Sequence, residues 1–202
     1  MALAATGIFV GGRALRMGGV PKGNLPYRGR SILEGTLESC AAAAAALGGS
    51  SPIYLIGESA AYAAIGVARL ADDPPGIGPM GGLRAFLSEA WRRGSDAVVL
   101  AVDLPHLTPE LLVRLYSEAP GVAALAPRQE DRWQPLFARY RPALALPEIE
   151  AALALGQTSL QAIFERLGDR ARCLELSLAE QRALRDWDRP SDMADADSEL
   201  ER

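Results

Sequence analysis

The residues with the clearest chemical potential lie in a glycine-rich basic loop near the N-terminus. Residues 11–22 of this loop read G-G-R-A-L-R-M-G-G-V-P-K, and Lys22 is the only lysine in a chain that has 20 arginines. An ammonium group is a compact point charge that suits a single phosphate oxygen, whereas a guanidinium fork suits planar, bidentate acceptors. The lysine therefore indicates a phosphate contact. The alternative is one lysine kept by chance in an arginine-biased composition.

The same loop offers further groups for a polyphosphate. Backbone N–H groups of Gly11 and Gly12 can approach an anion without interference from a Cβ atom, and Arg13, Arg16 and Lys22 can neutralise a triphosphate. The loop matches neither G-x-x-x-x-G-K-[ST] nor G-x-G-x-x-G, so the sequence supports neither a P-loop ATPase nor a Rossmann dinucleotide enzyme. The alternative is a flexible basic loop on the surface.

A second candidate follows the apolar run A-V-V-L-A-V, which ends at Asp103. A carboxylate at the mouth of a buried parallel strand is a hard oxygen ligand that suits Mg²⁺. The alternative is a turn or cap residue, because a proline and a threonine follow shortly. His106 is the only histidine. We expect it to be structural, because phosphate nucleophiles are already ionised and need no general base.

Other polar residues stand beside turns. Asp72 and Asp73 precede the second glycine- and proline-rich loop, at residues 74–82, so one could contact a ribose or base while the other solubilises the turn. Gln134 and Pro135 form a polar–proline step that enters a strand. Asp188 precedes a proline and is either a second metal ligand or a carboxylate at a helix N-terminus, where negative charge is favourable.

The elements that must position these residues alternate between strands and helices. Ser31 and Glu34 form a capping box at a helix start, and the helix ends at a glycine pair. This alternation predicts a single α/β domain over residues 1–202, a three-layer αβα sandwich with a mostly parallel, Rossmann-like sheet and a terminal helix or tail at about 192–202. We expect strands at 6–10, 52–56, 67–70, 96–102, 122–126, 135–140 and 172–176, and helices at 31–47, 62–65, 83–93, 108 onward, 144–155, 159–167 and 178–184.

Composition limits the function classes. The net charge is −4, which argues against a general nucleic-acid binder. No acidic residue precedes Glu34 although five basic ones do, so a small anionic ligand is expected there. Cys40 and Cys173 lie far apart and are expected to be buried thiols of a reducing, cytoplasmic compartment. No apolar run is long enough to span a membrane.

Taken in chain order, these motifs resemble those of the molybdenum cofactor guanylyltransferases, which have the glycosyltransferase-A-like nucleotidyltransferase fold. The family opens with L-A-G-G-x-x-x-R-M-G-x-x-K, which residues 9–22 match as F-V-G-G-R-A-L-R-M-G-G-V-P-K. Its later patterns are an acidic residue before G-P-L-A-G, then D-x-P, Q/H-P-L and N/D-T-P-E-D-L. Their counterparts are Asp72 with G-P-M-G-G at 78–82, D-L-P at 103–105, Q-P-L at 134–136 and D-R-P-S-D-M at 188–193.

The resemblance implies transfer of GMP from GTP to the terminal phosphate of molybdopterin, with Mg²⁺ as cofactor and release of pyrophosphate. Apo-molybdoenzymes or cofactor-insertion proteins would then receive the product. By this resemblance Phe9, Val10, Gly11 and Gly12 line the guanine and phosphate site, and Arg16 and Lys22 hold phosphates. Asp72 lies near the nucleoside, and Asp103 binds Mg²⁺. We also expect Arg13 and Gly78 to contact the nucleotide and Gln134 and Pro135 to contact the acceptor, while Asp188 is the candidate for a second metal ligand.

The sequence departs from the family at several of these positions. Phe9 and Val10 replace leucine and alanine, Pro21 replaces an acidic residue, and Ile56 stands where asparagine is frequent. Asp188 also stands where asparagine is common. The glycine pair at 11–12 favours the guanylyl branch, since cytidylyl relatives resemble A-A-G or A-G there. The alternatives are a related enzyme that uses CTP or a sugar-phosphate acceptor, and a non-catalytic nucleotide-binding subunit.

Overall fold

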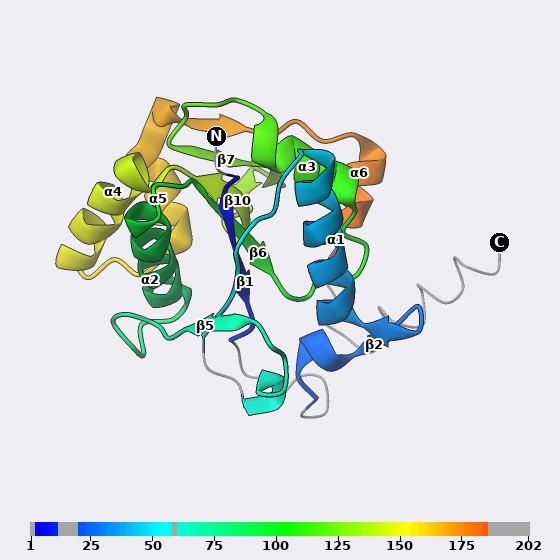
Figure 1. Cartoon of the computed structure of the whole chain (residues 1–202). Coiled ribbons are helices and arrows are strands. Elements are labelled where there is room, and N and C mark those ends of the chain that lie inside the picture. The colour runs from blue at the N-terminus through cyan, green and yellow to red at the C-terminus, as the bar shows by residue number, and fades with distance from the viewer. Residues whose placement is uncertain (1–2, 12–19, 58–59, 186–202) are drawn as a thin grey trace.

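A seven-stranded sheet forms the centre of the protein (Figure 1). The computed structural model describes residues 3–11, 20–57 and 60–185. The strand β10 runs antiparallel to its two neighbours, and the other neighbouring pairs are parallel. Across the sheet the strands are β11 (Ala171–Cys173), β7 (Ala124–Ala126), β10 (Phe137–Tyr140), β6 (Ala97–Ala101), β1 (Ala5–Phe9), β4 (Ile53–Ile56) and β5 (Ala68–Leu70).

Helices cover both faces of this sheet, which confirms the predicted three-layer αβα architecture (Figure 1). On one face lie α1 (Ile32–Ala46), α3 (Pro109–Ser117) and α6 (Leu178–Ala183), and on the other lie α2 (Pro79–Arg92), α4 (Pro142–Ala154) and α5 (Leu160–Leu167). In the described part of the chain, the short 3-10 helices η2 (Lys22–Asn24), η3 (Ala60–Tyr62) and η4 (Gly168–Arg170) connect other elements. Within the described residues, no helix has the length and apolar character that crossing a membrane would require.

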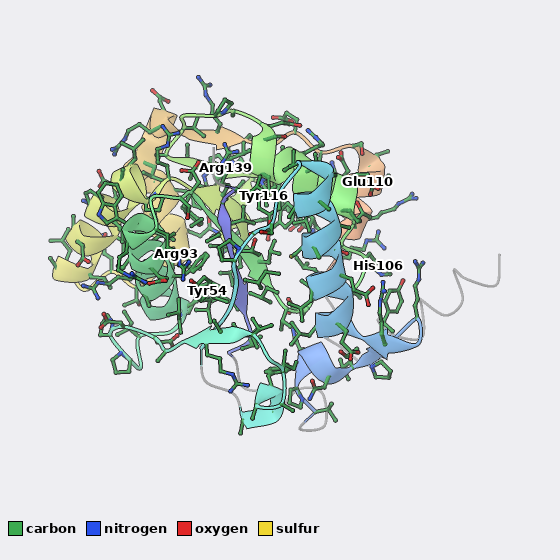
Figure 2. The ribbon with its side chains drawn as sticks, in the orientation of Figure 1. Tyr54, Arg93, His106, Glu110, Tyr116 and Arg139 are labelled. Atoms are coloured by element: carbon green, nitrogen blue, oxygen red, sulfur yellow. The ribbon has the colours of Figure 1, made fainter. Side chains whose placement is uncertain are left out.

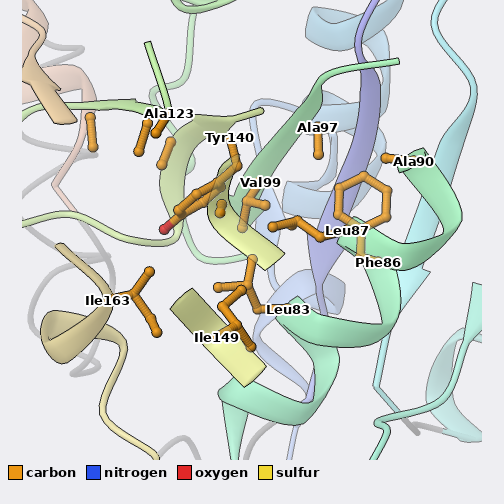
Figure 3. Close-up of a cluster of buried hydrophobic side chains, with 14 of the residues drawn as sticks. Leu83, Phe86, Leu87, Ala90, Ala97, Val99, Ala123, Tyr140, Ile149 and Ile163 are labelled. Carbon is orange, nitrogen blue, oxygen red and sulfur yellow. The ribbon is translucent and has the colours of Figure 1, made fainter. Parts of the chain in front are cut away.

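Alternation along the strands supplies the two hydrophobic layers. In β6, Ala97 and Val99 face the side of α2, while Val98 and Leu100 face the side of α1. Figure 3 shows the first of these layers, where Leu83 and Phe86 of α2 meet side chains from the sheet and α4. Because both faces are buried, β6 is apolar throughout, as the sequence predicted.

Local signals explain where the helices begin. The Ser31 side chain accepts from the Glu34 N–H and the Glu34 carboxylate accepts from the Ser31 N–H, so the capping box is confirmed. The helix α2 begins at Pro79, four residues before the predicted start at residue 83. Gly78 precedes it with a φ of 75°, and proline is pre-organised for the first helical position.

Two short hairpins were not predicted. They pair β2 (Pro26–Tyr27) with β3 (Arg30–Ser31) and β8 (Arg128–Gln129) with β9 (Arg132–Trp133). Their turns place residues 28–29 and 130–131 at positive φ, as two-residue hairpin loops require.

Two further expectations need correction. The short helix predicted at 62–65 is instead the 3-10 helix η3, which ends at Tyr62. The two cysteines also differ in burial: Cys40 is buried, as expected, whereas Cys173 is half-buried on the edge strand β11.

Candidate active site

The candidate residues gather at the carboxyl edge of the parallel strands. After β1 the chain forms β4 and β5 on one side of β1 and then returns to form β6 on its other side. In such sheets, ligands bind beyond the carboxyl ends of the strands where the strand order reverses. The backbone stays paired past the strand ends, since the Val10 N–H donates to the Ile56 carbonyl and the Val102 N–H donates to the Phe9 carbonyl. The loops that leave β1, β4 and β6 therefore start side by side.

The centre of this edge holds an ion pair between Lys22 and Asp103. Lys22 Nζ lies 2.7 Å from Asp103 Oδ2. Lys22 is the first residue of η2, and Asp103 stands two residues beyond the end of β6. Their side chains are 24% and 18% exposed, so both charges can still meet a ligand from solvent. The sequence singled out both residues, and the structure brings them together.

The chain next to this pair is packed closely around Gly23. The Gly23 N–H donates to the Tyr62 hydroxyl oxygen at 3.0 Å. A Cβ atom on residue 23 would lie 2.7 Å from Val102 Cγ2 and 2.8 Å from the Tyr62 hydroxyl oxygen. Burial raises the pKa of Tyr62, the Gly23 N–H opposes this rise, and the charge of Asp103 adds to it. Sequence reasoning gave Tyr62 no role, because its contact with Gly23 joins segments 39 residues apart.

A second group of candidates lies where β1, β4 and α2 meet. The backbones of Gly11 and Gly57 lie close together, because a Cβ atom on residue 57 would lie 3.3 Å from Gly11 Cα. The Asp72 side chain reaches the same place: its Oδ1 would lie 3.0 Å from a Cβ atom on residue 82 and 3.8 Å from one on residue 57. Phe9 is 8% exposed, and its ring packs against Gly82. Glycines thus keep side chains away from one carboxylate at this edge.

The two consecutive aspartates have different surroundings. Asp73 forms an ion pair with Arg84 of α2 at 2.5 Å, and its side chain is 66% exposed. Asp72 instead lies half-buried beside the glycines at the N-terminal end of α2. Of the two, Asp72 therefore has the position from which a nucleotide could be contacted, and Asp73 fixes the turn to the helix.

Gln134 and Pro135 lie at the same edge, because β10 runs antiparallel to β6 and begins there. The Ala101 N–H donates to the Leu136 carbonyl at 2.6 Å, which places this step beside the loop that carries Asp103. The Gln134 N–H donates to the Pro127 carbonyl, and the Tyr140 hydroxyl donates to the Pro135 carbonyl at 2.9 Å. The backbone of this step is thus held firmly, and the Gln134 side chain is half-buried.

Four of the predicted site residues, Gly12, Arg13, Arg16 and Asp188, lie outside the described residues. Among the residues that the structure does describe, no group of three or more histidine, cysteine or acidic side chains could hold a metal ion. Mg²⁺ does not need such a cage, because it is usually bound by one or two carboxylates, water and substrate phosphates. The partly exposed Asp103 carboxylate fits that pattern.

A cavity of about 390 Å³ is bordered by Leu104, the residue after Asp103. Its walls are the β2–β3 hairpin, the first turns of α1 and the loop from Leu104 to Thr108. His106 borders it (Figure 2). Its Nδ1 lies 2.9 Å from the Tyr27 hydroxyl oxygen, with the two rings edge to face. The structural role expected for the histidine stays a prediction. The cavity lining includes neither Lys22 nor Asp103.

The mostly parallel sheet with helices on both faces is the architecture of an α/β nucleotidyltransferase. Residues 7–171 match the model of the MobA-like NTP transferase domain, and the chain belongs to that family. A probable molybdenum cofactor guanylyltransferase of Methanosarcina mazei is 32% identical over 161 residues, which cover 77% of this chain and 70% of the relative. A molybdenum cofactor guanylyltransferase of Pseudomonas putida is 35% identical over 156 residues, which cover 76% and 78%.

A solved structure shows the same fold. The crystal structure of molybdopterin-guanine dinucleotide biosynthesis protein A from Archaeoglobus fulgidus superposes with a TM-score of 0.74. The match covers 98% of each chain at 24% sequence identity. The predicted family and fold class are thereby confirmed.

Proposed function

We propose that this protein is a molybdenum cofactor guanylyltransferase that works as a single domain over residues 1–202. A terminal phosphate oxygen of molybdopterin attacks the α-phosphorus of GTP. A new P–O bond forms, and the bond from the α-phosphorus to the bridging oxygen of the β-phosphate breaks. GMP is thereby joined to the acceptor, and pyrophosphate leaves. The names of the M. mazei and P. putida relatives support this substrate pair.

The observation that carries the proposal is the 2.7 Å contact between Lys22 and Asp103 at the carboxyl edge of the sheet. Phosphoryl and nucleotidyl transfers need little covalent chemistry from the protein, so positioning and charge neutralisation supply most of the catalysis. In this proposal the Lys22 ammonium donates to phosphate oxygens of the nucleotide, with help from Arg13 and Arg16. The Asp103 carboxylate would hold Mg²⁺, with Asp188 as a second ligand. The metal supplies Lewis-acid neutralisation of the phosphates.

The remaining candidates divide between nucleotide and acceptor. Asp72 faces the nucleoside, and the backbones of Gly11, Gly12 and Gly78 let the nucleotide approach the sheet edge closely. Phe9 and Val10 form the floor beneath the base. Gln134 and Pro135, on the far side of β6, contact the acceptor. The nucleotide and the acceptor phosphate then meet above the ends of β1 and β6.

The test is pyrophosphate release by the purified full chain with molybdopterin, Mg²⁺ and each nucleoside triphosphate in turn. We expect release with GTP well above release with CTP, and loss of release when EDTA removes the metal. Asp103→Asn should abolish most of the activity, whereas Asp73→Asn, an exposed aspartate at the same edge, should retain it. No release with GTP would overturn the proposal, and preferential release with CTP would assign the chain to the cytidylyl alternative.

Ligand binding gives a second arm of the test. A ligand at about 100 times its Kd stabilises the folded state by about 2.7 kcal/mol, so thermal unfolding with each nucleotide ranks their affinities. A non-catalytic nucleotide-binding subunit would bind GTP in wild type and Asp103→Asn alike and turn over in neither. An enzyme would release pyrophosphate as the wild type and would lose this activity as Asp103→Asn.

A further inference from the structure

We propose that Tyr62 is a positioning residue of the active site, which fixes the Lys22 ammonium against the Asp103 carboxylate through the backbone of Gly23. The inference rests on the proposed function for the roles of Lys22 and Asp103. It adds a residue that has no place in the motifs of the sequence and that donates nothing to a substrate.

The first step of the argument is the anchor itself. Tyr62 is 1% exposed, and its hydroxyl oxygen accepts the N–H of Gly23 at 3.0 Å. Gly23 directly follows Lys22 and is buried. A hydrogen bond to the next backbone nitrogen fixes the peptide unit from which the Lys22 side chain starts. The anchor lies on η3, which is separated from Lys22 by α1 and β4 in the chain.

The second step is the close fit on the other side of Gly23. A Cβ atom on this residue would lie 2.7 Å from Val102 Cγ2 and 2.8 Å from the Tyr62 hydroxyl oxygen, both closer than real Cβ contacts allow. Val102 is the residue directly before Asp103. The backbone at Gly23 is thus held between the Tyr62 ring and the chain that carries Asp103. One contact point sets the relative position of the two charged residues.

The third step concerns the protonation state of the anchor. Burial raises the pKa of Tyr62, and the charge of Asp103 raises it further, while the Gly23 N–H works in the opposite direction. A phenol is already neutral at physiological pH, and the upward shift of the Tyr62 pKa adds to this margin. A neutral phenol accepts from Gly23 without adding a second negative charge beside Lys22. The Asp103 carboxylate therefore remains the anionic partner of Lys22.

The variant that tests the anchor is Tyr62→Phe, which keeps the ring and removes the hydroxyl. Its matched control is Tyr54→Phe. Tyr54 is also buried, at 5% exposure, and its hydroxyl donates to Glu89 at 3.0 Å, but it lies on the α2 side of the sheet (Figure 2). Both changes remove one hydroxyl with one hydrogen bond. Only Tyr62→Phe leaves the Gly23 N–H without its acceptor.

The kinetic test is a double-mutant cycle for pyrophosphate release. We expect Tyr62→Phe to lower kcat about tenfold, because a misplacement near 1 Å can cost more than this. Tyr54→Phe should change kcat less than twofold. In a Lys22→Ala background Tyr62→Phe should have almost no further effect, since groups that act through one another are not additive. An equal loss in both backgrounds, or none in either, contradicts the positioning role.

A second readout does not depend on turnover. Because Lys22 is the only lysine, protein labelled with ¹³C-lysine gives the side-chain signals of a single residue. Tyr62→Phe should move the Lys22 ε-methylene signal toward the position of a solvated lysine, and Tyr54→Phe should leave it in place. An unmoved signal in Tyr62→Phe would refute the inference. If the wild type releases no pyrophosphate, the proposed function fails, and this spectrum still decides whether Tyr62 positions Lys22.

Discussion

Lys22 Nζ and Asp103 Oδ2 lie 2.7 Å apart although 81 residues separate them in the chain. Each residue was recognisable in the sequence by its own setting, as the sole lysine in a glycine loop and as a carboxylate after an apolar strand. Their contact places the two settings side by side at the carboxyl edge of the sheet. Since the pair is only partly exposed, water screens its charges less than at an open surface. Under the proposed function, a phosphate and a metal would meet groups that are already in place.

Lys22→Arg is the most informative conservative change. A guanidinium is planar and wider than an ammonium, and the Gly23 backbone beside it has no room to shift. We expect kcat to fall about 10²-fold, comparable with removal of one charge-stabilising donor in other enzymes, with the thermal unfolding midpoint unchanged within a few degrees.

The control for this change is the opposite exchange at a surface site. Arg93→Lys, at the residue after the end of α2, alters an ion pair with Glu89 at the opposite end of that helix from Gly82 and should leave turnover intact. Wild-type rates from Lys22→Arg would mean that the single lysine is an accident of composition.

The aspartates at 72 and 73 form a natural pair of test and control. Asp72→Asn should weaken GTP binding about tenfold. The half-buried carboxylate beside Gly82 faces the nucleoside in the proposed site, and the amide would be a weaker hydrogen-bond acceptor there. Asp73→Asn removes only an exposed ion pair with Arg84, which is worth at most about 1 kcal/mol of stability. Isothermal titration with GTP measures both. Equal affinities for the two variants would remove Asp72 from the nucleotide site.

Local signals in the sequence predicted the positions of many helices and strands. They did not predict contacts between segments that are distant in the chain. The capping box at Ser31 and the apolar run of β6 each depend on neighbouring residues, so their elements appeared where expected. The acceptor for Gly23 comes from Tyr62, which no periodicity connects to the loop. Arg28 has a positive φ in its turn, which is uncommon for an arginine and which the sequence did not indicate. Asp72 and Asp73 differ in burial, and the sequence pattern alone does not distinguish two adjacent aspartates.

Gly82 is expected to be a packing requirement of the site. A Cβ atom there would lie 2.7 Å from Ile56 Cγ2, 2.9 Å from Phe9 Cε1 and 3.0 Å from Asp72 Oδ1. Gly82→Ala should therefore push α2 away from β1 and β4, lower the free energy of unfolding by about 1–3 kcal/mol as overpacking does, and weaken GTP binding.

Gly66→Ala is the matched control, because a Cβ atom on residue 66 meets nothing within 4 Å. Urea unfolding and GTP titration of both variants measure the difference. If Gly82→Ala were as stable as Gly66→Ala and bound GTP normally, the close approach of α2 to the strand ends would have no role in the site.

The stability of the fold should fall at alkaline pH through Cys40. Burial raises the pKa of this thiol from 9.0 to about 12. Between these values the unfolded chain loses the thiol proton while the folded chain keeps it, so the free energy of unfolding decreases as pH rises above about 9. At pH 10.5 the loss from this residue is about 2 kcal/mol, since one pKa unit corresponds to about 1.4 kcal/mol.

Urea unfolding at pH 7, 9 and 10.5 measures this decline, and Cys40→Ala isolates the contribution of the thiol. The variant will be less stable at pH 7, because it loses buried volume, but its stability should fall less between pH 9 and 10.5. Tyr116, whose pKa burial raises to about 12, keeps part of the decline in both proteins. Cys173→Ala is the control, since that thiol is half-buried and should change the slope less. An identical slope in wild type and Cys40→Ala would show that Cys40 ionises in the folded protein as readily as in the unfolded chain.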